Sequence, residues 1–176
     1  MDTVVDIGAQ IGIFSCLAAK YADKVIAIEP HPVNFSLLRE NMRLNNQRNI
    51  VPSQMAVSGK NGVQTLFLSE QGTADHSLIP FDTESLIEVT TCTLERLIES
   101  YELESISLLK MDCEGCEYEV LNSSRKLLNR IDRLVLESHH GYTEELIRLL
   151  RDEGFVVSVE DNYIYAYSCS GNNNIP

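Results

Sequence analysis

The chain has 176 residues and a mass of 19.8 kDa, a size that fits one domain with a substantial core. Its hydrophobic content of 44% is typical of a globular protein and excludes a disordered one. The net charge of −12 disfavours a nucleic-acid partner, and no apolar run reaches the roughly 18 residues of a membrane span. We expect one domain over residues 1–170 and a frayed tail over residues 171–176.

The first predicted strand runs directly into a glycine loop. Residues 4–14 read VVDIGAQIGIF, and a helical pattern covers residues 11–19. Gly8 and Gly12 permit positive φ angles and a close approach of the backbone to a ligand. The spacing D-x-G-x-x-x-G differs from the dinucleotide fingerprint, and the Lys-Ser/Thr pair of a phosphate-binding loop is absent. The pattern therefore favours S-adenosylmethionine, whose carboxylate and amine would lie against the loop.

The second predicted strand, residues 24–28, ends at Glu29 and Pro30. Glu29 follows the glycine loop by about 20 residues, where a carboxylate can accept hydrogen bonds from both hydroxyls of a ribose. A surface glutamate at a strand end is the alternative, but the position one βαβ unit after the loop favours the ribose role. The proline ends the strand, and a helix is expected over residues 33–45.

Strand and helix patterns alternate along the rest of the chain. They predict an α/β fold of the Rossmann-like class I methyltransferase type, with a mostly parallel seven-stranded sheet, helices on both faces and a C-terminal antiparallel hairpin. The further strands are expected at residues 49–51 through 55–57, 63–68, 86–92, 106–111, 134–136, 155–159 and 163–167. The further helices are expected after Thr93 as N-cap, over residues 118–128, and from Thr143 as N-cap through Leu150. Residues 70–84 are the most loop-like part.

A cluster of carboxylates follows the predicted strand over residues 106–111. Asp112 and Glu114 stand at the strand end and on the turn after it, where open α/β sheets bind their ligands. Mutual repulsion would raise the pKa of at least one carboxyl group, which is how a site acquires a base that works near neutrality. Glu117 and Glu119 could be no more than acidic residues at a helix N-terminus.

These motifs together resemble the FkbM-type S-adenosylmethionine-dependent methyltransferases over nearly the whole chain. The matching segments are VVDIGAQIGIFS, VIAIEPHPVNFSLLRENMRLNN, VTTCTLERLIE, LLKMDCEGCEYEVL and LVLESHH. The resemblance implies a cofactor site for S-adenosylmethionine made of Asp6, Gly8, Ala9, Gly12, Glu29, Pro30, Ala56 and Val57. It also implies that Asp112, Glu114 and Glu117 line the methyl-transfer side and that the acceptor is a hydroxyl of a small metabolite or glycan.

Methyl transfer to a hydroxyl is an in-line displacement that is helped by positioning and by removal of the hydroxyl proton. Asp112 or Glu114 could be the base for that proton. Alternatively the two could bind Mg²⁺ or Ca²⁺, although no metal site is predicted. His139 and His140, close to a strand end, form a second candidate base.

The five cysteines lie scattered among apolar segments, which predicts free thiols in a reducing compartment, the cytoplasm by default. Cys113 and Cys116 form a C-x-x-C motif that could be a redox pair or half of a zinc site. We expect instead two free thiols that fill space behind the acidic loop, because no second paired motif supplies the other zinc ligands.

Two other functions stay open. Residues 26–46 also resemble a segment of tRNA guanine methylases, which favours an RNA methyltransferase. However, Asp112-Cys113-Glu114-Gly115 stands where amino-group methylases tend to carry Asn/Asp-Pro-Pro-Tyr. The chain could also be a cofactor-binding module that no longer catalyses. Similar methyltransferases usually have helices upstream of the first strand, so we expect a more open cofactor site here.

Overall fold

The computed structural model describes residues 2–69, 76–139 and 141–169, so the predicted tail over residues 171–176 and His140 lie outside the described part. The elements follow one another along the chain as β1 (Thr3–Ile7), α1 (Ile13–Ala18), β2 (Lys24–Ile28), α2 (Pro32–Leu44), β3 (Ile50–Ser53), β4 (Ala56–Val57), β5 (Gly62–Phe67), β6 (Leu86–Cys92), α3 (Leu94–Ser100), β7 (Leu108–Met111), α4 (Glu117–Ser123), the 3₁₀ helix η1 (Arg125–Arg130), β8 (Arg133–Glu137), α5 (Thr143–Asp152), β9 (Phe155–Glu160) and β10 (Tyr163–Ser168).

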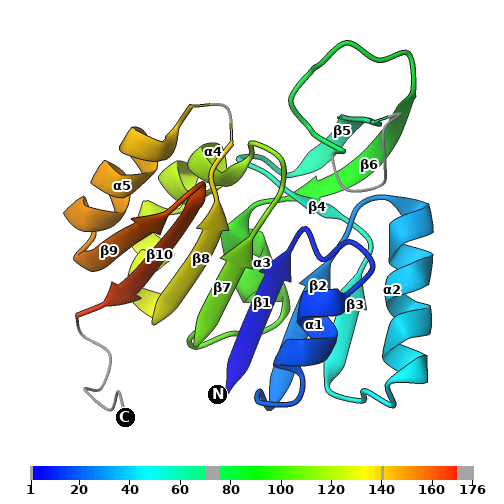
Figure 1. Ribbon diagram of the computed structural model, residues 1–176, viewed down its shortest axis with the longest axis horizontal. Coiled ribbons are helices and arrows are strands. Elements are labelled where there is room, and N and C mark those ends of the chain that lie inside the picture. Colours follow the sequence, from blue (N-terminus) through cyan, green and yellow to red (C-terminus); the bar gives the residue numbers. More distant parts are fainter. Residues whose placement is uncertain (1, 70–75, 140, 170–176) are drawn as a thin grey trace.

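Seven strands form the main sheet in the order β3-β2-β1-β7-β8-β10-β9 (Figure 1). β10 pairs antiparallel with both β8 and β9, whereas the other pairs are parallel. The predicted fold class is therefore confirmed. The strand order reverses between β1 and β7, so the crevice outside the carboxyl ends of these strands is the place where an open α/β sheet binds its ligand.

The central strands form because their apolar runs are buried on both faces. Val4 and Val5 on β1 are fully buried, as are Val25 and Ile26 on β2. Successive residues of each strand point to opposite faces of the sheet and enter two separate cores. One core lies beneath α1 and α2, and the other lies beneath α3, α4 and α5. In Figure 1, α1 lies in front of the sheet and α3 behind it. The two layers hold the strand ends, and thus the site, in a rigid frame.

A second sheet of three strands, in the order β4-β6-β5, stands above the carboxyl ends of the main strands (Figure 1). The prediction of a single strand over residues 49–57 is therefore wrong. β3 pairs with β2 as the edge of the main sheet, which suits Pro52 because an edge strand tolerates a missing N–H. The chain then turns away, and β4 pairs with β6 instead. This turn brings Ala56 and Val57 over the crevice.

Helix boundaries follow local capping and packing. Thr93 caps α3 as predicted, since its side-chain oxygen accepts the N–H of Arg96 at 3.1 Å. Thr143 does not cap α5: Tyr142 holds the N-cap position, and the Thr143 hydroxyl bonds to Ser138 Oγ at 2.8 Å. The helix expected over residues 118–128 ends at the C-cap Ser124 and continues as η1.

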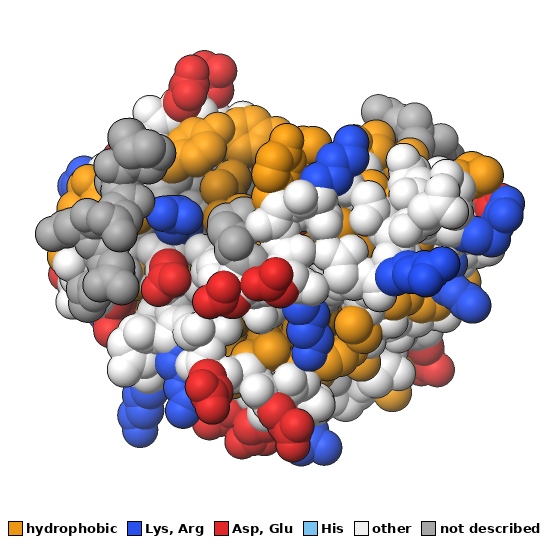
Figure 2. All heavy atoms as spheres, turned by 90° about the horizontal axis from the view of Figure 1, so that it is seen from below, with side chains coloured by type: hydrophobic (Ala, Val, Ile, Leu, Met, Phe, Trp, Pro, Cys, Tyr) orange, Lys and Arg blue, Asp and Glu red, His pale blue; other side chains and the backbone are white. Residues whose placement is uncertain are grey.

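The face of the molecule opposite the crevice carries charges of both signs. Figure 2 shows this face from below, with acidic and basic side chains interspersed among hydrophobic ones. Within the described residues, no helix has both the length and the apolar character needed to cross a membrane.

Candidate methyl-transfer site

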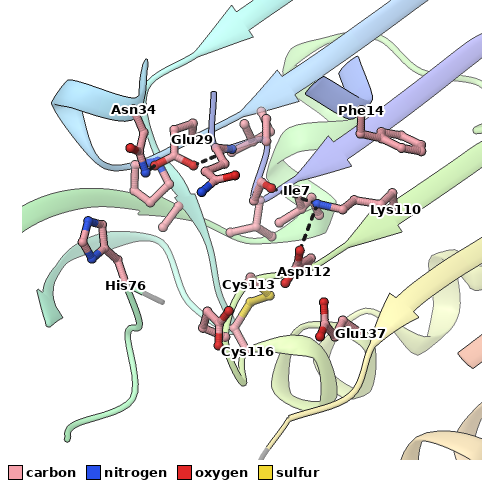
Figure 3. A pocket seen from close by; sticks show the side chains of 18 of the residues that line it. Ile7, Phe14, Glu29, Asn34, His76, Lys110, Asp112, Cys113, Cys116 and Glu137 are labelled. Carbon is pink, nitrogen blue, oxygen red and sulfur yellow. Dashed lines mark hydrogen bonds and ion pairs between the residues drawn. A yellow bond between two sulfur atoms is a disulfide. The ribbon is translucent and has the colours of Figure 1, made fainter. Parts of the chain in front are cut away.

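A cavity of about 500 Å³ lies at the carboxyl ends of the central strands. Its volume is in the range of sites that bind small molecules. Its walls include the sequence-predicted residues Gly8, Ala9, Glu29, Pro30, Ala56, Val57, Asp112 and Glu114. Asp6, Gly12 and His139 are not among the described residues that line it. Figure 3 shows Glu29 and Asp112 at separate parts of this cavity, with Ile7 between them.

The glycine loop follows β1 and contacts the ends of the two neighbouring strands, β2 and β7. The N–H groups of Gly8 and Ala9 donate to the carbonyl of Ile28 on β2 at 3.0 and 2.9 Å. Gly8 has φ +76°, and a Cβ there would overlap the carbonyl oxygen of Asp112 after β7. Only glycine meets both conditions. The loop therefore presents bare backbone to the cavity.

Asp6 lies beneath this loop and supports it. Its carboxylate is fully buried, accepts a hydrogen bond from Ser15 Oγ and lies 3.3 Å from Lys110 Nζ. Gly12 is the N-cap of α1, with φ +84°. Both residues thus shape the loop from behind.

Glu29 presents a fixed carboxylate to the cavity. Its two oxygens accept the N–H groups of His31 and Gln10, each at 2.9 Å, and Asn34 Nδ2 lies 3.4 Å away. Burial raises the pKa of Glu29, and these three hydrogen bonds oppose the rise. The carboxylate is therefore held in one orientation. Gln10 and Asn34 were not predicted as site residues, although both stand within one turn of a predicted loop or helix start.

The arm formed by the second sheet supplies an apolar wall, of which the sequence indicated Ala56 and Val57 but not Leu66 or Leu78. Met55 and Leu66 line the cavity beside Val57, and Leu78 and His76 follow from the segment after β5. The rings of His31 and His76 lie with their centroids 4.4 Å apart. No local pattern marks these residues as neighbours of the glycine loop, because they meet it only through the second sheet.

Lys110 ties the glycine loop to the acidic cluster. Its ammonium group donates to the carbonyl of Gly8 at 2.9 Å and lies 3.5 Å from Asp112 Oδ2 (Figure 3). Burial raises the pKa of Asp112, with Glu137 adding to the rise, while Lys110 and His139 lower it. Lys110 was not predicted as a site residue. It could have been recognised as the charged residue inside an otherwise apolar strand.

His139 joins three carboxylates. Its Nδ1 lies 3.1 Å from Glu117 Oε1, and its Nε2 lies 3.3 Å from Glu114 Oε2 and 4.0 Å from Glu137 Oε1. Burial alone would lower the pKa of His139, but the hydrogen bond with Glu117 and the charges of Glu117, Glu114 and Asp112 raise it to about 9. The imidazole is therefore protonated at neutral pH and holds the carboxylates together.

Glu117 is more than an acidic residue at a helix start. Its side chain is almost completely buried. One oxygen, Oε1, accepts the N–H groups of Cys113 at 3.0 Å and Gly115 at 3.4 Å in addition to its contact with His139. Glu117 thus fixes the loop that carries Glu114.

The same cluster has the atoms of a metal site. One ligand atom each from Asp112, Glu114 and His139 lies within 4.8 Å of the other two. Two carboxylates and an imidazole could hold a divalent cation. A cation would have to displace the proton of His139, because a histidine binds a metal through a neutral ring nitrogen.

Cys113 and Cys116 are joined by a disulfide, so the prediction of two free thiols at this motif is wrong. Glu114 and Gly115 both have positive φ angles, 56° and 106°, which fold the loop back on itself. The Cα atoms of the two cysteines thereby come within 5.6 Å, a separation that a disulfide can span. Cys16, Cys92 and Cys169 are free.

The reversal of strand order, the glycine loop with its partner carboxylate and the acidic cluster at the strand ends define a Rossmann-like methyltransferase. Residues 6–157 match the Methyltransferase FkbM domain. The chain belongs to this family, and the resemblance seen in its sequence is confirmed.

Relatives with known names agree with this assignment. The chain is 27% identical over 175 residues to the hexuronic acid methyltransferase AglP of Haloferax volcanii, covering 92% of this chain and 72% of AglP. It is 27% identical over 191 residues to methyltransferase sdnD of Sordaria araneosa, covering 88% of this chain and 74% of sdnD.

Solved structures show the same fold. An FkbM methyltransferase from Methylobacillus flagellatus KT superimposes with a TM-score of 0.68 and 18% identity over 95% of this chain. The chain spans 44% of that protein's length. SMU.1697c of Streptococcus mutans, solved in complex with SAH, superimposes with a TM-score of 0.54 and 13% identity, covering 94% of this chain and 88% of that one.

Proposed function

We propose that this chain transfers the methyl group of S-adenosylmethionine to a hydroxyl of a small metabolite or glycan. The observation that carries the proposal is one cavity that holds Glu29 in one part and Asp112 and Glu114 in another. A carboxylate for the ribose and a base for the acceptor can then serve the same reaction. The relative AglP is named for a hexuronic acid, which supports a sugar as the acceptor.

The residues present fit S-adenosylmethionine. The fixed carboxylate of Glu29 can accept both ribose hydroxyls, and the apolar side chains of Val57 and Leu66 suit an adenine ring. Gly8 and Ala9 keep the loop free of large side chains where the methionine end would lie. When bound, the cofactor supplies an electrophilic methyl group on a positively charged sulfur.

Asp112 is the base in this proposal. Its carboxylate lines the cavity, and burial raises its pKa, so it holds a proton more readily than an exposed aspartate does. Lys110, at 3.5 Å, keeps the carboxylate charged before the acceptor arrives. The proton of the acceptor hydroxyl passes to Asp112 as the new oxygen–carbon bond forms.

His139 has a positioning role in this proposal, because at neutral pH its protonated ring has no lone pair to accept a proton. Its two N–H groups face Glu117 and Glu114. Glu114 is thereby directed toward the cavity, where its carboxylate can accept a hydrogen bond from a second hydroxyl of the acceptor.

The test combines calorimetry with a turnover assay. Wild type should bind S-adenosylmethionine and transfer labelled methyl groups to members of a panel of neutral sugars, hexuronic acids and polyols. Asp112→Asn should keep its cofactor affinity within about twofold and lose roughly 100-fold or more in turnover, the usual contribution of a general base. Asp132→Asn, at an exposed position, is the matched control and should behave as wild type.

Three results would overturn the proposal. Absence of cofactor binding by wild type would exclude methyl transfer from S-adenosylmethionine. Transfer to tRNA and to none of the hydroxyl acceptors would replace the proposed substrate class. Full turnover by Asp112→Asn would remove Asp112 as the base.

A further inference from the structure

The disulfide between Cys113 and Cys116 lies in the wall of the cavity, next to the acidic residues (Figure 3). Cys116 is 3% exposed and packs within the larger core, whereas Cys113 is partly exposed. Only Glu114 and Gly115 separate the two cysteines, and Asp112 directly precedes them. The disulfide therefore restrains a loop that carries residues of the site.

The loop that the disulfide closes adopts an unfavourable backbone conformation. Glu114 has φ +56°, which residues other than glycine rarely adopt. Hydrogen bonds hold this loop conformation from two sides. Glu117 Oε1 accepts the N–H groups of Cys113 and Gly115. On the other side, Ser77 Oγ donates to the carbonyl of Glu114 at 2.6 Å. The disulfide adds a covalent restraint to a conformation that these hydrogen bonds alone would hold less firmly.

We infer that Cys113 and Cys116 form a reversible redox site whose disulfide holds the acidic loop in the geometry for methyl transfer. The inference rests on the proposed function for the role of the loop, but the chemistry of the sulfurs is independent of it. Bonded sulfurs lie about 2.05 Å apart, whereas atoms in nonbonded contact need roughly 3.5 Å or more. Reduction must therefore separate the two sulfurs by about 1.5 Å.

The displacement falls on the acidic loop rather than on the core. Cys116 is enclosed by close-packed side chains, which resist movement. Cys113 borders the open cavity and has room to move. Rotation of the Cys113 side chain is enough to separate the sulfurs, but the dithiol form no longer ties Cys113 to the core. Its direct neighbours in the chain, Asp112 and Glu114, thereby lose a covalent restraint on their positions.

Formation of the disulfide is balanced by reduction of a low-molecular-weight disulfide such as glutathione disulfide. The Cys113 thiol loses its proton and attacks one sulfur of this oxidant, which releases one thiolate and leaves a mixed disulfide. The Cys116 thiol then loses its proton and displaces the second thiolate from the Cys113 sulfur. Two protein thiols are oxidised, one external disulfide is reduced, and the two protons go to the released thiolates. A dithiol reductant reverses both steps.

The local charge favours the oxidised form. Asp112, Glu114 and Glu117 are close neighbours of the two cysteines in the chain, and these carboxylates outnumber the cations Lys110 and His139 that lie beside them. The excess of negative charge disfavours a thiolate. A disulfide is neutral and meets no such repulsion. The pair thus lacks the stabilised thiolate that makes some C-x-x-C proteins strong oxidants.

The experiment compares the full chain treated with glutathione disulfide or with dithiothreitol. After oxidation, three of the five cysteines should react with an alkylating reagent in denaturant, and all five should react after reduction. Reduction should speed hydrogen exchange of the Gly115 amide by about tenfold, and lower turnover by roughly tenfold or more, because a shift of about 1 Å can cost up to 100-fold. Cys113→Ala/Cys116→Ala should respond to neither reagent, whereas the control Cys169→Ser should respond as wild type does.

Five reactive thiols after glutathione disulfide would overturn the redox site. So would equal exchange of Gly115 in the two forms of wild type, or a double variant that still responds to reductant. If neither form binds S-adenosylmethionine, the proposed function fails, while the thiol count and the exchange rates still decide whether the redox site exists.

Discussion

Replacing His139 with glutamine should change how the stability of the protein depends on pH. In the folded chain the pKa of His139 is raised to about 9 from a reference value of 6.5, because Glu117, Glu114 and Asp112 surround the ring. A raised pKa means that the folded state holds the proton more tightly than the unfolded state does. The stabilisation is therefore complete below about pH 6.5 and is lost as the pH rises through 9.

The size of the effect follows from the two pKa values. Each pKa unit corresponds to about 1.4 kcal/mol, so the difference between about 9 and 6.5 amounts to at most about 3 kcal/mol of unfolding free energy. The side chain is 17% exposed, so solvent screens this interaction only in part. The free-energy difference between wild type and His139→Gln should thus shrink by up to about 3 kcal/mol between roughly pH 6 and pH 10.

Urea unfolding followed by circular dichroism at a series of pH values measures this difference, since the chain has no tryptophan for fluorescence. Comparison with His139→Gln removes the contribution of all other titrating groups. Glu117→Gln should also flatten the dependence, because it removes the largest partner of the ring. A free-energy difference that stays constant over this pH range would refute the assignment of a protonated His139.

Three further changes test the site. Gly8→Ala should lower the free energy of unfolding by more than about 2 kcal/mol, because its Cβ would overlap the Asp112 carbonyl at a positive φ; an unchanged melting temperature would contradict this. Glu29→Gln should weaken S-adenosylmethionine binding by roughly tenfold in calorimetry through loss of a charge-assisted hydrogen bond, while the exposed control Glu95→Gln should not. A chelator should change turnover by less than about twofold, since the cationic side chains of Lys110 and His139 already lie against the carboxylates of the acidic cluster; loss of activity restored by Mg²⁺ would show that a metal is required.

Much of the fold was predictable because its signals are local. The apolar runs of β1 and β2, and the glycines and proline that end or follow them, lie within the first 30 residues. Alternation of strands and helices then leads to a mostly parallel sheet through general rules of chain connection. The split between β3 and β4 was missed because an apolar run does not reveal which neighbour a strand will pair with.

The candidate site was predictable where it depends on strand ends. Asp112 and His139 follow neighbouring parallel strands, β7 and β8, and parallel strands bring their carboxyl ends to one edge. Lys110 and Glu117 were harder to interpret, because their partners lie across the sheet or in the folded-back loop. Residues from the arm, such as Leu66, carry no local signal for the cavity at all.

The sequence by itself determined the family, the sheet and the identity of the main acidic and glycine residues, because each depends on neighbours close along the chain. The tertiary structure alone decided three properties: the apolar wall that the arm contributes, the protonated state of His139 and the pairing of Cys113 with Cys116. Each of these arises from groups brought within a few ångströms by folding, where burial, charge and covalent geometry act over distances that the linear sequence does not specify.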